Sequence, residues 1–297
     1  MLTKWDELGI DKSGLQRLVE QALAEDRARE DATTAIFIPP AQRGRGIFVS
    51  KARGVVCGLP VAAVVFAALD LSLAWRSLVH DGASIQPGDK LAEVEGALAP
   101  ILSAERVALN FLQHLSGIAT LTRRFLEQLS GTSARLRDTR KTVPGLRDLQ
   151  KYAVRIGGGS NHRLHLADGV LLKDNHLSAL RARGLTLADA VRLARDSAGD
   201  LPVEIEVTTV AEAAEALDAG AAELLLDNMP PAQMREVVAL ADGRAVLEAS
   251  GGITLETARE VAQTGVDFLA VGALTHSARA LDISLDVEIA HGEPVEP

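Results

Sequence analysis

Cations in this chain gather where apolar segments give way to polar or glycine-rich ones. Arg140 and Lys141 stand side by side in the run DTRKTVPG, just before a Pro-Gly turn. His162 and Arg163 follow a run of glycines, and Lys173 ends the apolar run GVLLK. Arginine and lysine side chains are common partners of carboxylates and phosphates. These residues therefore predict a cage for an anionic substrate.

Carboxylates and glycines follow at the ends of the later apolar segments. Glu206 and Asp227 suit a hard divalent cation such as Mg2+, which keeps most of its waters and bridges to phosphate groups. The runs 250–252 and 272–273 are glycine-rich turns that open onto predicted helix N-termini, where exposed N–H groups bind phosphate. Each feature alone also fits an ordinary surface charge or turn. Together they predict a phosphorylated substrate and a second acid.

All these residues end strand-like segments. The segments are LRDT (136–139), GVLLK (169–173), VEIEV (203–207), AELLLD (222–227), AVLEAS (245–250) and DFLAVG (267–272). Amphipathic helical stretches separate most of them, and Thr186, Thr209 and Thr254 are the expected N-caps. An open sheet would concentrate its ligand contacts at one switch point, whereas a barrel brings all strand ends to one face. We therefore expect an α/β protein with an incomplete, TIM-like β/α barrel of about six strands.

The first part of the chain has a mixed pattern that predicts an α+β sandwich domain. Helices are expected over 15–26 and 59–69, and strands over 46–58 and 87–96. Residues 103–131 predict a helix, a break near Gly117 and a second helix. We expect the N-terminal domain to span 1–116, joined by the C-terminal tail 279–297, and the barrel to span 117–278.

Composition excludes several classes of protein. The formal net charge of -9 disfavours a nucleic-acid partner unless the chain has a strong local basic patch. Cys57 is the single cysteine, which excludes an intramolecular disulfide framework and a cysteine-built zinc site, so we expect it to fill the core. The longest apolar run, 59–69, is too short to span a bilayer, and the first residues lack the apolar core of a signal peptide. We expect a cytoplasmic protein without a membrane anchor.

Six motifs, in this order and spacing, resemble the quinolinate phosphoribosyltransferase family, also called nicotinate-nucleotide pyrophosphorylase (carboxylating). They are DTRKTVPGLR (138–147), GGGSNHR (157–163), LLKDNH (171–176), LLLDNM (224–229), LEASGGI (247–253) and VGALTHS (271–277). The resemblance implies a Mg2+-dependent pentosyltransferase that joins quinolinate to phosphoribosyl pyrophosphate. The products would be nicotinate mononucleotide, CO2 and pyrophosphate, on the route to NAD. It also implies a homodimer or a multiple of dimers.

The same resemblance assigns roles to individual residues of this chain. Arg140, His162, Arg163 and Lys173 are assigned to the two carboxylates of quinolinate. Lys141, Glu206 and Asp227 are assigned to catalysis, with Glu206 and Asp227 also holding Mg2+, partly through water. The remaining assigned substrate contacts are Thr139, the 5′-phosphate loop residues Ser250, Gly251, Gly252, Val271, Gly272, Ala273 and His276, and Arg106, which would reach the site of the neighbouring subunit.

Three alternatives stay open. A paralogue linked to molybdate transport shares several of these motifs and would act on a different acid. Lys173 at a strand end also fits the Schiff-base lysine of an aldolase-like barrel. A sensor that only binds an anionic metabolite would keep the cations, but it would have no need for the paired carboxylates Glu206 and Asp227.

Overall fold

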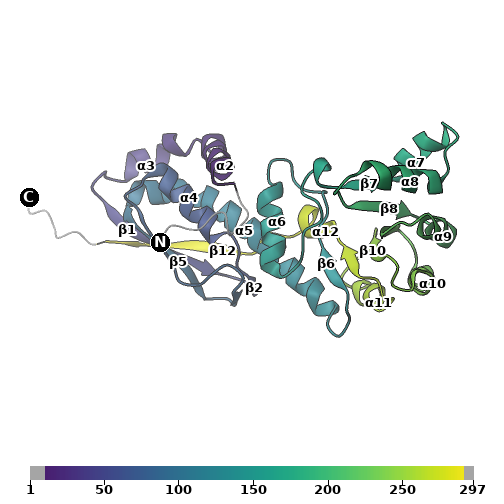
Figure 1. Ribbon diagram of the computed structural model, residues 1–297. Helices are drawn as coiled ribbons and strands as arrows, with labels where there is room; N and C mark the ends of the chain where they lie inside the picture. The colour runs from purple at the N-terminus through teal and green to yellow at the C-terminus, as the bar shows by residue number, and fades with distance from the viewer. Residues whose placement is uncertain (1–10, 291–297) are drawn as a thin grey trace, which may run out of the picture. The chain divides into compact units, whose positions relative to one another are not determined.

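The computed structural model describes residues 11–290, which divide into two compact units (Figure 1). The first unit comprises Met1–Leu121, Pro144–Gly157 and Ala278–Pro297, and the second comprises Thr122–Val143 and Gly158–Ser277. The predicted domain ends 1–10 and 291–297 lie outside the described residues. No helix within residues 11–290 combines the length and the apolar character that crossing a membrane requires.

The first unit is built on an antiparallel sheet with the strand order β12-β1-β5-β3. Its strands are β1 (Arg43–Ser50), β3 (Ala74–Ser77), β5 (Lys90–Ala97) and β12 (Ile283–Ile289), with β2 (Gly54–Val55) and β4 (Ser84–Ile85) as a separate short pair. Its helices are α2 (Lys12–Glu25), the 3-10 helix η1 (Ala28–Glu30), α3 (Ala32–Phe37), α4 (Leu59–Leu69) and α6 (Arg147–Gly157). Phe48 anchors the core, with ring centroids 5.9 Å from Phe66 and 5.4 Å from Trp75.

Segments distant in sequence complete this unit. β12 pairs with β1 from Ser50↔Ile283 to Gly44↔Ile289, so the chain returns to the first unit near its end. The segment Pro144–Gly157, which we expected within the barrel, also groups here. Tyr152 contributes to this grouping, because its hydroxyl donates a 2.7 Å hydrogen bond to the partly buried carboxylate of Asp81.

Helix α5 (Leu98–Gln128) runs from the first unit into the second without interruption. The predicted break near Gly117 is therefore wrong. A Cβ at Gly117 would lie 2.9 Å from the carbonyl carbon of Arg279 and 3.1 Å from the Cα of Ala280. Glycine is thus present because another part of the main chain approaches the helix closely, and not because the helix ends there.

The second unit confirms the predicted incomplete β/α barrel. Its parallel six-stranded sheet has the order β6-β11-β10-β9-β8-β7. The strands are β6 (Arg135–Arg137), β7 (Val170–Leu172), β8 (Val203–Val207), β9 (Glu223–Asp227), β10 (Val246–Ser250) and β11 (Phe268–Ala270). The helices are η2 (Leu166–Asp168), α7 (Asp174–Arg181), α8 (Leu187–Ser197), α9 (Val210–Asp218), α10 (Pro231–Ala241), α11 (Ala258–Ala262) and α12 (Ala273–His276). Figure 1 shows α8, α9, α10 and α11 in an arc outside the strands.

The barrel is open between β6 and β7, which form the two edges of the sheet. Ser160 lies along the β6 edge, where its N–H donates to Leu136 O at 2.9 Å and its carbonyl accepts from Asp138 N at 3.1 Å. This pairing leads the chain directly to His162 and Arg163. The open edge is therefore the element that carries these two residues to the strand ends.

Side-chain caps begin two of the outer helices as predicted. Thr186 accepts a hydrogen bond from Asp189 N at the start of α8, and Thr209 accepts one from Glu212 N at the start of α9. The third predicted cap is wrong, because Thr257 precedes α11 and Thr254 lies one turn earlier. These caps satisfy N–H groups that have no partner within the helix itself.

Candidate active site

A cavity of about 300 Å3 lies at the carboxyl ends of the barrel strands. Its lining residues are Thr139, Arg140, Lys141, His162, Arg163, Leu171, Lys173, Glu206, Leu225, Asp227, Glu248, Ser250 and Ala270. The structure thus brings together the predicted cations, both predicted carboxylates and one residue of the predicted phosphate loops. A ring of strand ends explains why segments so distant in sequence meet here.

Two guanidinium groups give this cavity its preference for anions. Arg140 has a buried Nε without a hydrogen-bond acceptor among the described residues, an uncommon state for a buried donor. Burial, followed by the charge of Arg140, lowers the pKa of Arg163. Arg163 also donates to Gly169 O at 2.7 Å, which fixes its guanidinium at the cavity wall. A bound carboxylate would supply the acceptor that Arg140 lacks and offset the repulsion between the two cations.

Lys141 lies where the cavity meets the last loop of the barrel. Its N–H donates to Thr139 Oγ1 at 3.0 Å, and its carbonyl accepts from Thr275 Oγ1 at 2.8 Å. A Cβ added to Gly272 would lie 3.2 Å from Lys141 Cδ and 3.1 Å from His276 Nε2. The lysine side chain, this glycine and His276 are therefore neighbours.

Most of the predicted phosphate-loop residues adjoin the cavity without lining it. Ser250 lines it, whereas Gly251, Gly252, Val271, Gly272, Ala273 and His276 are absent from its wall. Gly251 and Gly252 have φ angles of 93° and 63°, a conformation that residues with a side chain rarely adopt. The turn after β10 therefore requires these two glycines.

The two carboxylates occupy adjacent strands. Glu206 Oε2 lies 3.4 Å from Lys173 Nζ, and Glu206 Oε1 accepts a hydrogen bond from Asp174 N at 3.2 Å. Asp227 is the last residue of β9, and its carboxylate accepts a 2.8 Å hydrogen bond from the side-chain amide of Asn228. Two carboxylates that face one cavity are suitable donors for Mg2+, which binds proteins through one or two such groups and otherwise keeps its waters.

Arg106 belongs to the first unit. It lies exposed on α5, and its assignment to a neighbouring subunit's site stays a prediction.

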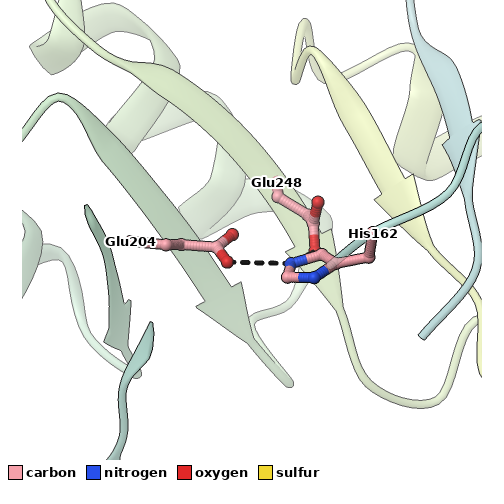
Figure 2. Close-up of side chains that lie close together, drawn as sticks. All are labelled: His162, Glu204 and Glu248. Carbon is pink, nitrogen blue, oxygen red and sulfur yellow. Dashed lines mark hydrogen bonds and ion pairs between the residues drawn. The ribbon is translucent and has the colours of Figure 1, made fainter. Parts of the chain in front are cut away.

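Three charged residues beside His162 were not predicted: Arg137, Glu204 and Glu248, the last of which lines the cavity. Figure 2 shows the carboxylates of Glu204 and Glu248 close to the ring of His162. His162 Nε2 lies 2.9 Å from Glu204 Oε2 and 3.6 Å from Glu248 Oε1, and Arg137 donates to Glu248 Oε2 at 2.8 Å. A sequence signal exists for both glutamates. Each lies two residues before a predicted site residue, Glu206 or Ser250, and residues two apart in a strand share a face.

Burial and the neighbouring charge of Glu204 raise the pKa of Glu248 to about 7. The carboxyl is almost completely buried, and its Oε1 has no hydrogen-bond partner among the described residues. A buried carboxylate without full hydrogen bonding retains its proton more readily. Glu248 therefore brings a carboxyl that retains its proton more readily to the cavity that Glu206 and Asp227 also line.

His162, Glu204 and Glu248 offer ligand atoms within 4.8 Å of one another, but the hydrogen bonds oppose a metal. Arg163 N donates to His162 Nδ1 at 2.8 Å, so Nδ1 has no proton. A histidine that binds a metal through Nε2 normally keeps a proton on Nδ1 and donates it to an acceptor. In His162 the roles are reversed, because Nδ1 accepts a hydrogen bond and Nε2 is the nitrogen that faces a carboxylate.

Comparison with protein families accounts for nearly the whole chain. The quinolinate phosphoribosyl transferase N-terminal domain matches residues 31–116, and the C-terminal domain of the same enzyme matches residues 118–286. The chain is 47% identical to the nicotinate-nucleotide pyrophosphorylase [carboxylating] of Mycobacterium leprae, over 91% of this chain and 95% of that protein. It is 41% identical to a probable nicotinate-nucleotide pyrophosphorylase [carboxylating] of Bacillus subtilis, over 95% and 96% of the two chains.

Solved structures agree with this result. The crystal structure of NadC from Streptococcus pyogenes superposes with a TM-score of 0.90 and 37% identity, over 95% of this chain and 99% of that one. The nicotinate-nucleotide pyrophosphorylase of Francisella tularensis gives a TM-score of 0.88 and 36% identity, over 94% and 98% of the two chains. The chain therefore belongs to the quinolinate phosphoribosyltransferase family of pentosyltransferases.

Proposed function

We propose that this protein transfers the phosphoribosyl group of phosphoribosyl pyrophosphate to quinolinate and releases CO2, giving nicotinate mononucleotide for NAD synthesis. The observation that carries the proposal is the pairing of Arg140 and Arg163 in one cavity with Glu206 and Asp227. The arginines suit an aromatic dicarboxylate, and the carboxylates suit ribose hydroxyls and a hydrated cation.

Within this proposal each part of the cavity has one substrate group to bind. Arg140, Arg163 and Lys173 hold the carboxylates of quinolinate, with His162 beside them. Thr139 and Lys141 face the pyrophosphate and the reacting carbon. Glu206 and Asp227 bind the ribose. The 5′-phosphate lies against the loops that contain Ser250, Gly251, Gly252, Val271, Gly272, Ala273 and His276.

The first step needs orientation more than acid–base chemistry. The ring nitrogen of quinolinate has its own lone pair, so it can attack the ribose carbon as pyrophosphate leaves, without a general base. Lys141 stabilises the negative charge that develops on the leaving group, and the cations opposite hold the ring in line. Mg2+ bound through Glu206 and Asp227 would neutralise pyrophosphate.

Loss of CO2 follows from the first step. Once the ring nitrogen is bonded to ribose it is positively charged, so it stabilises the electron pair that stays on C-2 when the adjacent carboxylate departs as CO2. A proton then replaces the lost group at C-2. Arg140 and Arg163 keep the 3-carboxylate in place meanwhile, so no second cofactor is needed.

We further propose that the protein works in the cytoplasm as a dimer or a multiple of dimers, with Arg106 entering the site of the adjacent subunit. The buried free thiol of Cys57 suits a reducing compartment. The exposed position of Arg106 on α5 leaves it available to a partner.

Mass spectrometry of the products tests the proposal. Purified protein is incubated with phosphoribosyl pyrophosphate and Mg2+, with quinolinate in one tube and nicotinate in another. We expect nicotinate mononucleotide and CO2 from quinolinate alone. No product from either acid would contradict the proposal and favour the paralogue that uses a different acid.

A further inference from the structure

A layer of charged side chains lies inside the barrel next to the cavity, and one of its members, Glu248, also lines the cavity. Glu204 comes from β8 and Glu248 from β10, and both lie beside the ring of His162 (Figure 2), while Arg137 from β6 donates a hydrogen bond to Glu248. Glu223 on β9 adds a further carboxylate, and its burial, followed by the charge of Glu204, raises its pKa. Such a layer has no direct substrate role in the proposed reaction, so its purpose requires another explanation.

The hydrogen bonds of His162 define the protonation of its ring. Arg163 N donates to Nδ1 at 2.8 Å, which requires a bare Nδ1. Nε2 then carries the proton and donates it to Glu204 Oε2 at 2.9 Å. A ring with one proton, on Nε2, is neutral. His162 is therefore a link between a carboxylate in the interior and the main chain of Arg163.

Charge alone would favour a second proton on this ring. Burial lowers the pKa of His162, but the hydrogen bond to Glu204 and the charges of Glu248 and Glu204 raise it by more. A second proton would have to sit on Nδ1, where it would face the N–H of Arg163. Protonation would thus replace a hydrogen bond with contact between two donors, and the raised pKa of Glu248 weakens the negative charge that favours it.

We infer that Glu204 is a positioning residue, which holds His162 as the neutral Nε2–H tautomer and thereby fixes Arg163 at the wall of the anion cavity. The inference rests on the proposed function for its effect on substrate binding. Arg163 is held from several sides in this arrangement: its N–H by His162, its guanidinium by Gly169 O, and the preceding residue by Asp138, whose Oδ1 accepts from His162 N at 2.9 Å. His162 then contributes to the site through the hydrogen bond by which its neutral ring holds Arg163, and not through a positive charge.

Two substitutions at Glu204 separate geometry from charge. Glu204→Gln keeps an oxygen that can accept from Nε2–H, whereas Glu204→Ala removes the acceptor. We expect Glu204→Ala to raise the KM for quinolinate by about tenfold, equivalent to the loss of one hydrogen bond of about 1.4 kcal/mol, with the KM for phosphoribosyl pyrophosphate unchanged. Glu204→Gln should stay within about threefold of the wild type. Glu223→Gln is the matched control, since Glu223 faces the same interior without a hydrogen bond to His162.

The ring itself supplies a readout that does not depend on activity. Nitrogen-15 spectra of histidine-labelled full-length protein, with His162 assigned from a His162→Gln variant, distinguish the two neutral tautomers and the charged ring. We expect the Nε2–H tautomer at pH 7 in the wild type and in Glu204→Gln. A charged His162 at pH 7, or an unchanged quinolinate KM in a folded Glu204→Ala variant, would overturn the inference. Failure of the wild type to use quinolinate would instead contradict the proposed function and leave the tautomer result intact.

Discussion

Lys141 is anchored through its main chain, which leaves its side chain available to the cavity. Thr139 and Thr275 hold its N–H and its carbonyl, and the side chain is exposed. At the scale of single residues, a substitution of this side chain can therefore change activity without changing the stability of the fold, because an exposed lysine contributes little to the core. It also makes Lys141 a clean target for substitution.

We expect Lys141→Ala to lower kcat by at least about 100-fold, because it removes a cation beside the developing negative charge. The melting temperature should remain within about 2 °C of the wild type. Steady-state kinetics and thermal denaturation measure the two effects. Lys90→Ala, at an exposed lysine of β5 in the first unit, is the control and should change neither. An unchanged kcat in Lys141→Ala would refute the assigned role.

Glu248 is a residue whose protonation affects stability. Its pKa is raised to about 7 in the folded protein from an ordinary value of 4.5. Between these two pH values the folded protein keeps the proton and the unfolded chain loses it, so the free energy of unfolding falls as the pH rises from about 4.5 to about 7. The whole effect is roughly 3 kcal/mol at most.

Glu248→Gln should remove this part of the pH dependence, because the amide does not titrate. Urea unfolding at pH 5 and at pH 7.5 measures the change for both proteins. The variant should gain stability relative to the wild type at the higher pH. Parallel pH profiles for the two proteins would show that Glu248 is not protonated in the folded state. Glu236→Gln, at an exposed position on α10, controls for the loss of a surface charge.

At the scale of elements, α5 shows how a tertiary contact can reverse a local rule. Alanine replacing glycine inside a helix usually stabilises it by up to about 1 kcal/mol. At Gly117 the added Cβ would meet the carbonyl group of Arg279 and the Cα of Ala280. The helix or the segment beside it would have to move.

We therefore expect Gly117→Ala to destabilise the protein by about 2 kcal/mol, as overpacking does. Urea unfolding measures the sign directly. Asn110→Ala, at an exposed position on the same helix, should be neutral or slightly stabilising and serves as the control. A more stable Gly117→Ala variant would mean that the Arg279 segment does not approach the helix closely in solution.

At the scale of the whole molecule, the proposed sharing of sites between subunits has a quantitative consequence. Each site would use Lys173 of its own chain and Arg106 of the neighbouring chain. In a mixed dimer of Arg106→Ala and Lys173→Ala chains, both substitutions therefore fall in one site, and the other site is intact. Random pairing after co-expression should then restore about a quarter of the wild-type activity. Activity of the mixture relative to each separate variant measures this recovery.

A matched mixture controls for artefacts of co-expression. Lys141→Ala and Lys173→Ala both lie in the barrel of their own chain, so every site of their mixed dimers carries a lesion. This mixture should recover nothing. Recovery in the control, or its absence with Arg106→Ala, would contradict the assignment of Arg106 to a neighbouring site.

The residues of the strand ends were predictable because two local signals coincide there. Apolar runs of strand length predicted β6 to β11, and the polar residue that ends each run predicted where the chemistry collects. Arg140, Lys173, Glu206 and Asp227 needed no tertiary information beyond the convergence of parallel strands, and they do line one cavity. Their individual roles stay predictions.

Local patterns by themselves thus determined the barrel, its order of strands along the chain and the chemical character of its face. Only the tertiary structure decided three other features: the continuity of α5 past Gly117, the grouping of Pro144–Gly157 with the first unit, and the position of Glu204 and Glu248 beside His162. The physical reason is common to all three. Each depends on an approach between segments distant in sequence, and periodicity along a chain records which face of an element is buried but not what is buried against it.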